Sequence, residues 1–515
     1  MAERRVVVIG GGLAGMTVAW ELARRGEAVL LLEASSRLGG KAGSNLVDGR
    51  FYDHGYHVFP GWYANTRHLL RRLDLASHLI DIHCVHYVKP GEFPRRHSLW
   101  ELSSPLNLWR NLRAGLIPWY DAILASYFAL DLSSAPFSHR SLLDLVSASG
   151  YLRSRPYATE GVAAAHEAFV LQAASIPNYE ISAMTAKRVT ESWFRIPSPI
   201  FSILDGSLQE TFIHPFQRAL EEAGVEVVLR RRVQRLIPDG SRISGIAFDD
   251  GSKPVETSRG DAFVLATPHE VTYRFVDAQV DAAEACRKSY PASEKRLSDL
   301  AHLRSAPMAA MHLGLRRRVP EIPREHVVLV GSRYELSFVD VSQHWTGIDH
   351  TLLSVIASNF APLEELPESH VRDELLTEIL TYLQPVVAAN DVDPKLVHVF
   401  PNVNVPLFLN TVGAWTYRPN TKTRFDNLYI AGDYCRTSAD LTTMESAISS
   451  GLATTGHLLR DLGHRERLVP QSIPAWPRLP MRALAFGLLP SILALRLGVA
   501  IWERSGWAQA PRADA

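Results

Sequence analysis

The apolar positions at the start of the chain predict a strand, a helix and a second strand in quick succession. Four consecutive apolar residues, 6–9, are too few for a helix and predict a buried parallel strand. A helix is predicted over residues 16–25, Gly26 ends it, and residues 28–32 predict a second apolar strand. Strand, helix and strand in this order are the building unit of a parallel sheet, so the chain opens as an α/β protein.

The pattern of apolar and polar positions predicts alternating helices and strands over most of the remaining chain. Amphipathic helices are predicted over residues 66–75, 216–223 and 368–383, and a long apolar helix rich in Trp and Tyr over residues 105–132. Strands are predicted over residues 225–229, 233–237, 243–248, 261–268 and 427–433, and strands of a second sheet over 308–315, 335–341 and 352–356.

Length and composition indicate a globular protein of two or more domains. The chain has 515 residues, of which 46% are hydrophobic and 21% charged, and this length exceeds a single core. Lys+Arg and Asp+Glu both number 54, so the net charge argues against nucleic acid as a partner. Cys84, Cys286 and Cys435 form no C-x-x-C pair, which indicates a reducing compartment and argues against a metal site or a disulfide framework. The apolar run after Arg4 and Arg5 has four residues, so no signal peptide is predicted.

A glycine motif follows the first predicted strand. Gly10, Gly12 and Gly15 form G-x-G-x-x-G around Leu13 and Ala14. This spacing permits a tight turn, the approach of a pyrophosphate to the backbone, and close contact between helix and strand. The pyrophosphate would bind at the N-terminus of the helix, where free N–H groups favour an anion. Because such glycines also occur in ordinary turns, the context of the motif decides its meaning.

That context is supplied by Glu33 and the residues after it. Glu33 ends the second predicted strand, about twenty residues beyond the motif, where a carboxylate accepts ribose hydroxyls. It disfavours a 2′-phosphate but leaves both NAD and FAD open. A second anion-binding bend follows, suited to a long dinucleotide, and comprises Ala34, Arg37, Gly39, Gly40 and Lys41. This stretch resembles the FAD fingerprint of the amine oxidase and carotene desaturase superfamily, which implies FAD as a non-covalent cofactor.

An aromatic segment with two histidines comes next, over residues 51–63. By itself it is typical of a packed core loop, but in this superfamily the equivalent segment passes the isoalloxazine. Gly55, His57, Val58 and Tyr63 are similar to a segment of the plant and cyanobacterial phytoene and zeta-carotene desaturases, although Pro60 departs from its second aromatic residue. The bacterial hydroxysqualene dehydroxylases have a similar segment, so the resemblance does not choose a substrate.

The cofactor motif is completed near the C-terminus. Gly432 and Asp433 end an apolar strand, and a helix beginning near Thr442 or Thr443 would direct its positive N-terminus at the flavin. Residues 427–451 resemble the closing motif of the same desaturases, with Ser446 replacing a glycine. The resemblance also places Met444 at the flavin and a backbone amide near Val233 at the adenine, while Asp433 accepts bonds from ribityl hydroxyls or orders water at the pyrophosphate.

The resemblance implies a Rossmann-like FAD-binding domain with an inserted α+β substrate domain and a C-terminal amphipathic tail. The expected FAD-binding parts are 1–79, 198–300 and 421–465. The expected substrate-domain parts are 80–197, which is predicted to be helical, and 301–420. The tail is 466–515.

The tail contains thirteen uncharged residues, 483–495, followed by Arg496 and a second apolar run over 497–502. Thirteen residues are short of a membrane span, and Pro490 and Arg496 argue further against one. Arg482, Trp502 and Trp507 suit a helix that lies in the membrane interface. Packing on the protein body and a true span are the alternatives, and the 105–132 helix is a second interfacial candidate.

Together these features predict an FAD-dependent oxidoreductase that transfers a hydride from a carotene- or squalene-like isoprenoid lipid to the flavin. The expected location is cytoplasmic, on the surface of the cytoplasmic membrane, with quinone or oxygen as electron acceptor. His57 and Thr442 are candidates for positions near the flavin and substrate, and no catalytic base is assigned. Arg188 and Arg195 are candidate tunnel-end contacts or plain surface charges. The alternatives are a hydroxysqualene dehydroxylase or carotenoid isomerase, an FAD-dependent amine oxidase, and a flavin-bound membrane protein without turnover.

Overall fold

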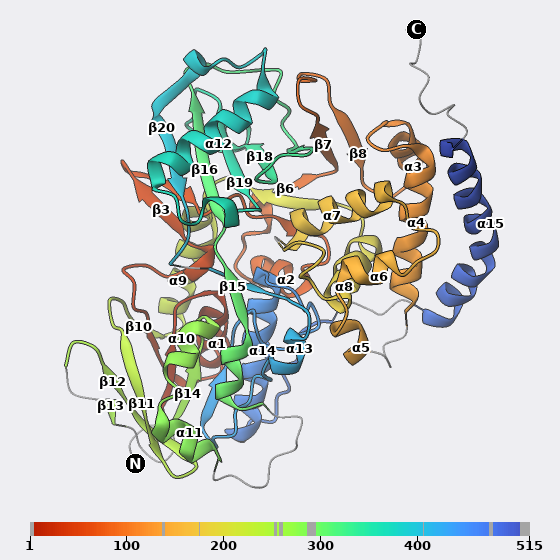
Figure 1. The fold of residues 1–515 in the computed structure, drawn as a ribbon. Helices are drawn as coiled ribbons and strands as arrows, with labels where there is room; N and C mark the ends of the chain where they lie inside the picture. The colour runs from red at the N-terminus through yellow and green to blue at the C-terminus, as the bar shows by residue number, and fades with distance from the viewer. Residues whose placement is uncertain are drawn as a thin grey trace.

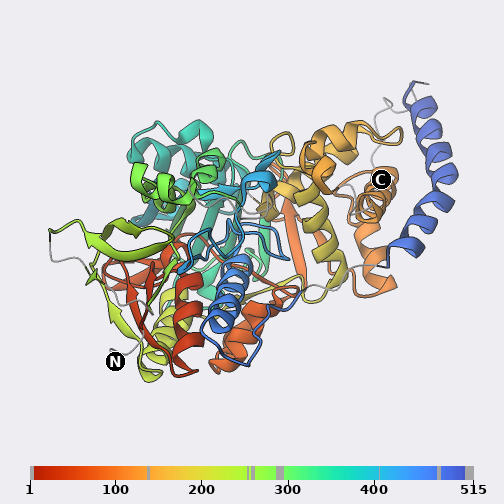
Figure 2. The ribbon, with the colours of Figure 1, turned by 90° about the horizontal axis from the view of Figure 1, so that it is seen from below.

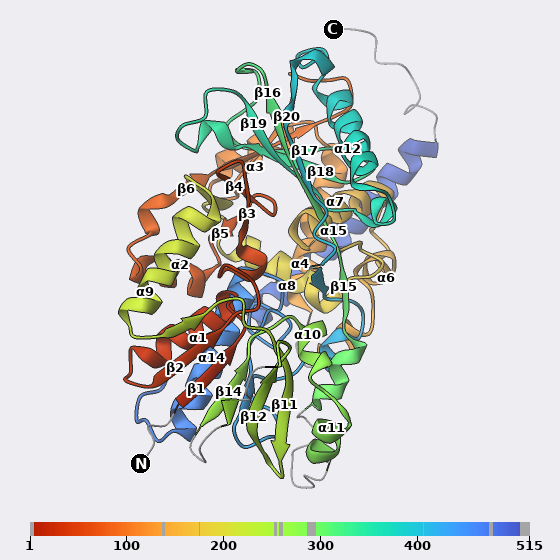
Figure 3. The same cartoon turned by 90° about the vertical axis from the view of Figure 1, so that its left-hand side faces the viewer.

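The fold described here is that of a computed structural model (Figure 1). It describes residues 5–135, 140–174, 176–251, 255–256, 261–285, 295–404, 406–472 and 477–504. Cys286 and Trp507 lie outside these ranges. Two sheets dominate the described chain, a parallel one in the lower part of Figure 3 and a larger one above it.

The parallel sheet is assembled from four separate stretches of sequence. Its strands run in the order β10-β2-β1-β14-β22, and every neighbouring pair is parallel. Their bounds are Glu226–Val228, Ala28–Leu32, Arg5–Ile9, Ala262–Leu265 and Leu428–Ile430. This order confirms the Rossmann-like fold predicted from the alternation of strand and helix at the N-terminus.

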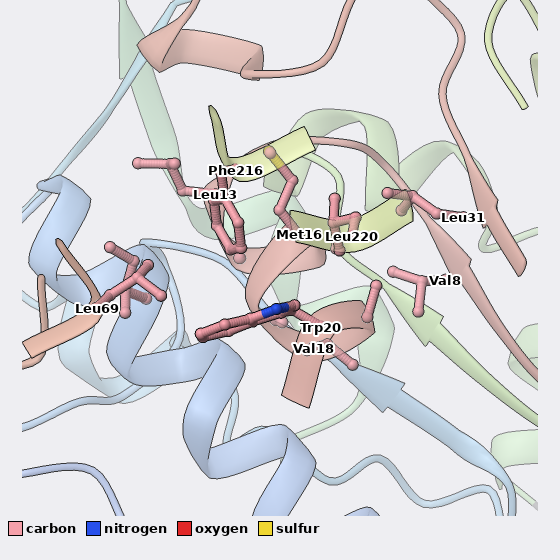
Figure 4. Packing of buried hydrophobic residues seen from close by; sticks show 14 of the residues in the cluster. Val8, Leu13, Met16, Val18, Trp20, Leu31, Leu69, Phe216 and Leu220 are labelled. Atoms are coloured by element: carbon pink, nitrogen blue, oxygen red, sulfur yellow. The ribbon is translucent and has the colours of Figure 1, made fainter. Parts of the chain in front are cut away.

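Helices cover one face of this sheet. They are α1 (Leu13–Ala23), α2 (Ala64–Arg72), α9 (His214–Glu222) and α14 (Met444–Asp461). Val8 and Leu31 of the sheet pack with Met16 and Trp20 of α1 and with Phe216 of α9, and all are nearly or fully buried (Figure 4). The alternate strand residues, such as Val7 and Leu30, belong to a second core on the opposite face. Because both faces are covered, the strands are apolar throughout, as is typical of a parallel sheet.

The opposite face is covered by a smaller antiparallel sheet and short helices. The sheet contains β11 (Val233–Asp239), β12 (Arg242–Phe248) and β13 (Val255–Glu256). The helices are α10 (His269–Arg274) and α11 (Ala278–Ala285), followed by a 3-10 helix, Leu297–His302.

The second large sheet has seven strands in the order β20-β16-β19-β18-β17-β7-β8. Their bounds are Val392–Phe400, Ala309–Leu315, Leu352–Ala357, Leu336–Asp340, His326–Leu329, Cys84–Val88 and His97–Trp100. The helix α12 (Glu368–Leu383) packs on it, within the bounds predicted from the sequence. Three predicted strands are confirmed here as β16, β18 and β19.

The segment 80–197 begins with strands, so its prediction as an all-helical segment is wrong over its first twenty residues. β6 (Leu79–Ile82) pairs with β9 (Phe201–Leu204), which also pairs with β5 (Phe59–Pro60), while β7 and β8 join the seven-stranded sheet. Strands this short leave no helix-or-strand period to detect in an isolated window. The remaining two-stranded sheets are β3 (Ser44–Val47) with β4 (Arg50–Asp53), and β15 (Arg304–Ala306) with β21 (Leu407–Leu409).

The rest of that segment forms a helical layer. It contains α3 (Pro105–Arg113), α4 (Trp119–Ser134), α5 (Arg140–Asp144), α6 (Ala148–Arg153), α7 (Glu160–Ala174) and α8 (Ala183–Arg195). The single helix predicted over 105–132 is therefore wrong, because α3 and α4 are separate helices. Between them Gly115 has a φ of +69° and Pro118 immediately precedes α4, and both residues interrupt a helix.

The short helical elements complete the described chain. They are α13 (Ala414–Tyr417), a π-helical turn Gln209–Ile213 before α9, and 3-10 turns at Gly40–Ala42, Ala76–His78, Val341–Gln343, Ala361–Leu363 and Ala389–Asp391.

Within the tail, α15 (Arg478–Arg504) is one continuous helix, which lies along α4 at the edge of the molecule (Figures 1 and 2). Its buried residues are Ala485, Ile492 and Val499, which are spaced seven apart and form one stripe. The Tyr127 hydroxyl of α4 donates a hydrogen bond of 2.8 Å to the Ala485 carbonyl. The helix passes through Pro490, whose position is exposed, so the carbonyl that loses its usual partner there can meet solvent.

Of the described helices, α15 has the length and the composition to cross a membrane. Its 27 residues exceed the thirteen-residue run that the sequence suggested, because the helix continues through both Pro490 and Arg496. Of its most apolar stretch of 18 residues, only 17% is buried against the rest of the protein.

Candidate functional site

Two glycine loops meet at the C-terminal edge of the parallel sheet. Gly12 and Gly39 form a parallel bridge, and the Gly39 amide donates a 2.9 Å hydrogen bond to the Gly11 carbonyl. Gly40 has a φ of +57°, and a Cβ there would lie 3.1 Å from the Gly12 Cα. At Gly12 itself, an added Cβ would meet nothing closer than 4.0 Å, so the backbone there is open to a ligand. The motif and the second bend therefore form one site.

The third glycine of the motif allows the helix to begin directly beside the strand. A Cβ at Gly15 would lie 2.0 Å from the Gly10 carbonyl oxygen, which no rotation of a side chain can relieve. Leu13 and Ala14 form the first turn of α1, and Gly12 before them supplies no side-chain cap. The first N–H groups of the helix therefore remain available to an anion.

Glu33 lies at the end of β2, beside the first loop. Its Oε2 accepts a 2.7 Å hydrogen bond from the Gly11 amide, and its Oε1 accepts one of 2.7 Å from the Ser35 amide. The Glu33 amide donates to the Val228 carbonyl, and the Glu33 carbonyl accepts from the Arg231 amide. Val233, the first residue of β11, follows Arg231 by two residues. The structure thus brings together the three parts expected to bind the adenosine half of the cofactor, and Ala34 is exposed next to them.

Lys41 and Asp433 face one another across the same edge, although they are almost four hundred residues apart in sequence. Their Nζ and Oδ2 atoms are 3.8 Å apart. Within the described chain, the buried Nζ of Lys41 has no hydrogen-bond partner. Such an ammonium, beside an open backbone and a helix N-terminus, fits a pyrophosphate. Arg37 lies elsewhere, with its guanidinium 5.7 Å from the centre of the Phe51 ring.

The N-terminus of α14 is built by three consecutive residues. Thr443 is the N-cap, and its Oγ1 accepts a 3.1 Å hydrogen bond from the Ser446 amide. Thr442 donates from its Oγ1 to the Phe408 carbonyl at 2.5 Å, so this hydroxyl already has a backbone partner. Met444, the first residue of α14, is half-buried. Ahead of this helix, the Gly432 amide donates to the Ser450 hydroxyl at 2.8 Å.

The aromatic segment divides between two environments. Tyr63 is buried, and burial raises the pKa of its hydroxyl, which also contacts the N-cap Thr443. His57 lines a small cavity together with Asp53, Val339 and Trp345. Gly55 lies against Ile356 of β19, and its carbonyl accepts a 2.9 Å hydrogen bond from the Nδ1 of His57. The two candidate flavin-proximal residues therefore lie in different surroundings, His57 in this cavity and Thr442 at the N-terminus of α14.

Burial shifts the pKa values of the titratable groups around His57 in the direction that favours their neutral forms. Burial lowers the pKa of His57 to about 4 and that of His326 to about 3. Burial raises the pKa of Asp53 to about 7, against hydrogen bonds from Ser44 and the Leu208 amide that favour its ionised form. A desolvated environment that favours neutral forms suits an apolar ligand better than a charged one.

An apolar cluster that the sequence did not identify lies beside the N-terminus of α14. Its buried members are Trp62, Tyr63, Val189, Ala439 and Leu441, with Phe169, Trp193, Ile196 and Met444 packed against them. Val189 and Trp193 come from α8. The sequence shows the spacing of apolar residues in this helix but not which surface they contact. Arg188 and Arg195 lie on the same helix and are half-buried. Among the described residues, no group of three His, Cys, Asp or Glu side chains is arranged to hold a metal ion.

Comparisons with known proteins show the family to which the chain belongs. The family model described as flavin-containing amine oxidoreductase matches residues 13–459. A 15-cis-phytoene desaturase of an Oncidium hybrid cultivar is 25% identical over 478 residues, covering 88% of this chain and 78% of that protein. A probable zeta-carotene desaturase of Synechococcus elongatus is 25% identical over 493 residues, covering 87% and 97%. Among solved structures, a redesigned putrescine oxidase has a TM-score of 0.65 at 16% identity, covering 89% of this chain and 99% of that one.

Proposed function

The chain belongs to the family of flavin-containing amine oxidoreductases, and from this premise we propose that it is a desaturase-type enzyme acting on an isoprenoid lipid. It is an FAD-dependent oxidoreductase, as the family and its desaturase relatives establish. When bound, the flavin supplies an acceptor for a hydride at N5. The substrate we propose is a carotene- or squalene-like hydrocarbon chain.

For the cofactor, we propose that the backbone around Gly12 and Gly40 receives the pyrophosphate, with Lys41 as its counter-charge. Glu33 accepts hydrogen bonds from the adenosine ribose while it continues to hold the Gly11 amide. Asp433 accepts hydrogen bonds from the ribityl chain or orders water at the pyrophosphate. The buried ammonium of Lys41, which has no hydrogen-bond partner within the described chain, supports this assignment.

The observation that carries the substrate proposal is the apolar cluster at the N-terminus of α14. It consists of aromatic and aliphatic side chains from the aromatic segment, α7, α8 and the segment before α14. The one titratable side chain among them is Tyr63, and burial raises its pKa further. An allylic C–H bond needs orientation and exclusion of water more than it needs a base, so the residues here position the substrate rather than move a proton.

An anaerobic titration tests this proposal. The purified holoprotein is mixed without oxygen with phytoene, with hydroxysqualene, or with simple amines, and the absorbance of oxidised flavin is followed. We expect bleaching by an isoprenoid and none by amines. Bleaching by amines alone would contradict the lipid proposal and favour an amine oxidase, for which the fold of putrescine oxidase is a precedent. A flavin that no compound bleaches would favour a protein without turnover.

Product analysis then separates the isoprenoid alternatives. A desaturase yields a product with one additional double bond and needs an acceptor in each turnover. A carotenoid isomerase gives a product of unchanged mass, and a hydroxysqualene dehydroxylase removes a hydroxyl group. We propose a quinone as the acceptor, because it shares the membrane with the substrate, and oxygen is the alternative. Turnover with quinone but without peroxide formation would distinguish the two.

We further propose that the outer face of α15 rests on the cytoplasmic face of a membrane and that the protein is otherwise cytoplasmic. This face exposes Leu484, Phe486, Leu497, Ile501 and Trp502, while the inner stripe is held on α4. The helix also carries four arginines, Arg478, Arg482, Arg496 and Arg504, against one acidic residue, Glu503. Exposed apolar area and positive charge together favour a bilayer with anionic lipids.

Flotation with phosphatidylglycerol-containing vesicles tests the membrane proposal. The double variant Phe486→Glu/Leu497→Glu changes only exposed positions, so the packing on α4 remains. We expect it to lose most of its vesicle binding. Leu46→Glu/Leu366→Glu, which alters two exposed leucines on other parts of the surface, is the matched control and should bind as the unmodified protein does. Equal binding by both double variants would refute contact through this face.

A further inference from the structure

The segment that joins β22 to α14 has no regular secondary structure between residues 431 and 443, yet both of its ends face the cofactor site. Asp433 lies near its beginning, opposite Lys41, and Thr443 caps α14 at its end. A bound FAD would contact both ends, so the distance between them must match the cofactor. Something other than backbone pairing must therefore fix the course of this segment.

One buried side chain spans it. Arg418, which directly follows α13, is 1% exposed. At the start of the segment its guanidinium donates to three successive carbonyls, those of Asp433 at 3.4 Å, Tyr434 at 3.0 Å and Cys435 at 2.7 Å. At the far end, its Nη1 donates to the carboxylate of Asp440 in an ion pair whose two side chains are both almost fully buried.

The residue at the far end is itself held in an unusual conformation. Asp440 has a φ of +58°, which residues other than glycine adopt rarely and which the surroundings must maintain. Its amide donates to the Thr437 hydroxyl at 3.3 Å, and its carbonyl accepts from the Asn410 side chain at 2.9 Å. The ion pair with Arg418 anchors the carboxylate of this residue, so the turn before α14 is fixed from both the backbone and the side chain.

Only arginine can make this set of contacts. Its planar guanidinium has five N–H donors in a fixed arrangement, whereas lysine has a single point charge at the end of a flexible chain. The rings of Phe408 and Trp415 lie 5.3 Å and 5.2 Å from the guanidinium carbon, which further restricts its orientation.

We propose that Arg418 is a positioning residue for the cofactor, which holds Asp433 and the N-terminus of α14 at the separation that FAD requires. Arg418 itself contacts protein groups at both ends of the segment and acts through them. The proposal depends on FAD as the cofactor and not on the identity of the substrate. It can therefore stand or fall separately from the isoprenoid proposal.

Two properties of the bound flavin should report on this role. If the two ends of the segment shift, the cofactor cannot satisfy both, and we expect its dissociation constant to rise about tenfold or more. The positive end of α14 favours negative charge, and reduction adds negative charge to the flavin ring. A displaced helix should therefore make the midpoint potential of the flavin more negative. Both quantities are measured on the protein and FAD, without any substrate.

Arg418→Lys is the decisive variant, because it retains the positive charge and loses the multiple contacts. If Arg418 acts by position, Arg418→Lys should show both changes, close to those of Arg418→Met. Asp440→Asn keeps the arginine and weakens its ion pair at the far end of the segment, so it should show smaller changes of affinity and potential with the same sign. It tests the proposal if the arginine variants do not fold. Lys187→Met is the matched control: Lys187 is a fully buried cation paired with Glu191 at 2.9 Å, in the helical layer.

We expect Lys187→Met to lower the melting temperature but to leave the flavin affinity and potential as they are. An Arg418→Lys variant with unchanged affinity and potential would overturn the proposal, because charge alone would then suffice. The same changes in Arg418→Lys and in Lys187→Met would also overturn it, because they would reflect a general loss of stability.

Discussion

Replacing Glu445 by glutamine should destabilise the protein more than any exposed substitution, because this carboxylate joins the N-termini of two helices. Glu445 is the second residue of α14 and is 3% exposed. Its Oε1 accepts from the amide and the side chain of Asn65, at 3.0 Å and 2.7 Å. Its Oε2 accepts from the amide and the hydroxyl of Thr66, at 2.8 Å and 2.7 Å. Both partners belong to the first turn of α2, whose free N–H groups the carboxylate satisfies.

The magnitude follows from the donors that would lose their partner. Glutamine retains one acceptor oxygen and presents an NH2 group to the other pair of donors, so two of the four hydrogen bonds are lost. A hydrogen bond to a charged group contributes about 1.5–3 kcal/mol. Allowing for relaxation and for the lost interaction with the dipole of α2, we expect a loss of about 4 kcal/mol. For a cooperative unit of about 250 residues, this lowers the melting temperature by roughly 8 °C.

Thermal melts followed by far-UV circular dichroism and by flavin fluorescence give the measurement. Glu160→Gln at the start of α7 is the control, because its side chain is 89% exposed and lies 3.9 Å from that of Arg153. It should change the melting temperature by no more than about 2 °C, as expected of an exposed pair. If Glu445→Gln melts within the same range, the four contacts do not stabilise the junction of α2 and α14, and the reasoning is refuted.

Three further predictions concern the cofactor site and pH. Gly15→Val should yield protein without flavin, as measured by absorbance at 450 nm, because its Cβ would lie 2.0 Å from the Gly10 carbonyl oxygen; normal flavin content would contradict this. Glu33→Ala should weaken FAD binding about tenfold in fluorescence titrations through loss of a ribose contact, whereas unchanged affinity would exclude Glu33 from the site. The pKa of Asp53 is raised to about 7 in the folded protein, so its contribution is most favourable below about pH 4 and is lost as pH rises to 7. Asp53→Asn, which keeps an acceptor for the Ser44 hydroxyl, should therefore be more stable than the unmodified protein above pH 7, by up to about 4 kcal/mol in urea unfolding; equal stability at pH 8 would contradict the raised pKa of Asp53.

The cofactor half of the fold could be predicted because its chemistry is local. The strand, the glycines and Glu33 lie within thirty residues, and each has a defined geometric task. FAD and the Rossmann-like sheet are confirmed on this basis. The individual site roles, such as that of Val233 at the adenine, remain predictions, as does the division of the chain into domains.

The substrate half depends on contacts that no local pattern contains. β7 reaches its sheet by pairing with β17, some 240 residues later, so its five residues gave no sign of their neighbours. Arg418 looks like any exposed arginine in the sequence, and its burial depends on a segment that arrives after it. The stripe of Ala485, Ile492 and Val499 was hidden because apolar residues cover the outer face of α15 as well.

The division of the parallel sheet among distant segments also sets the order of events on the ribosome. β1 and β2 are complete within the first 32 residues, but β22 begins at Leu428 and α14 ends at Asp461. At about 5–20 residues per second, the closing strand leaves the ribosome roughly 20–80 seconds after the first one. Until then, the open edge of β14 and the side of α1 that packs on α14 have no partner, and the cofactor has only half of its predicted site. We therefore expect FAD uptake to be a late step in the making of this protein, and α15 is the last described element to cover the surface of α4.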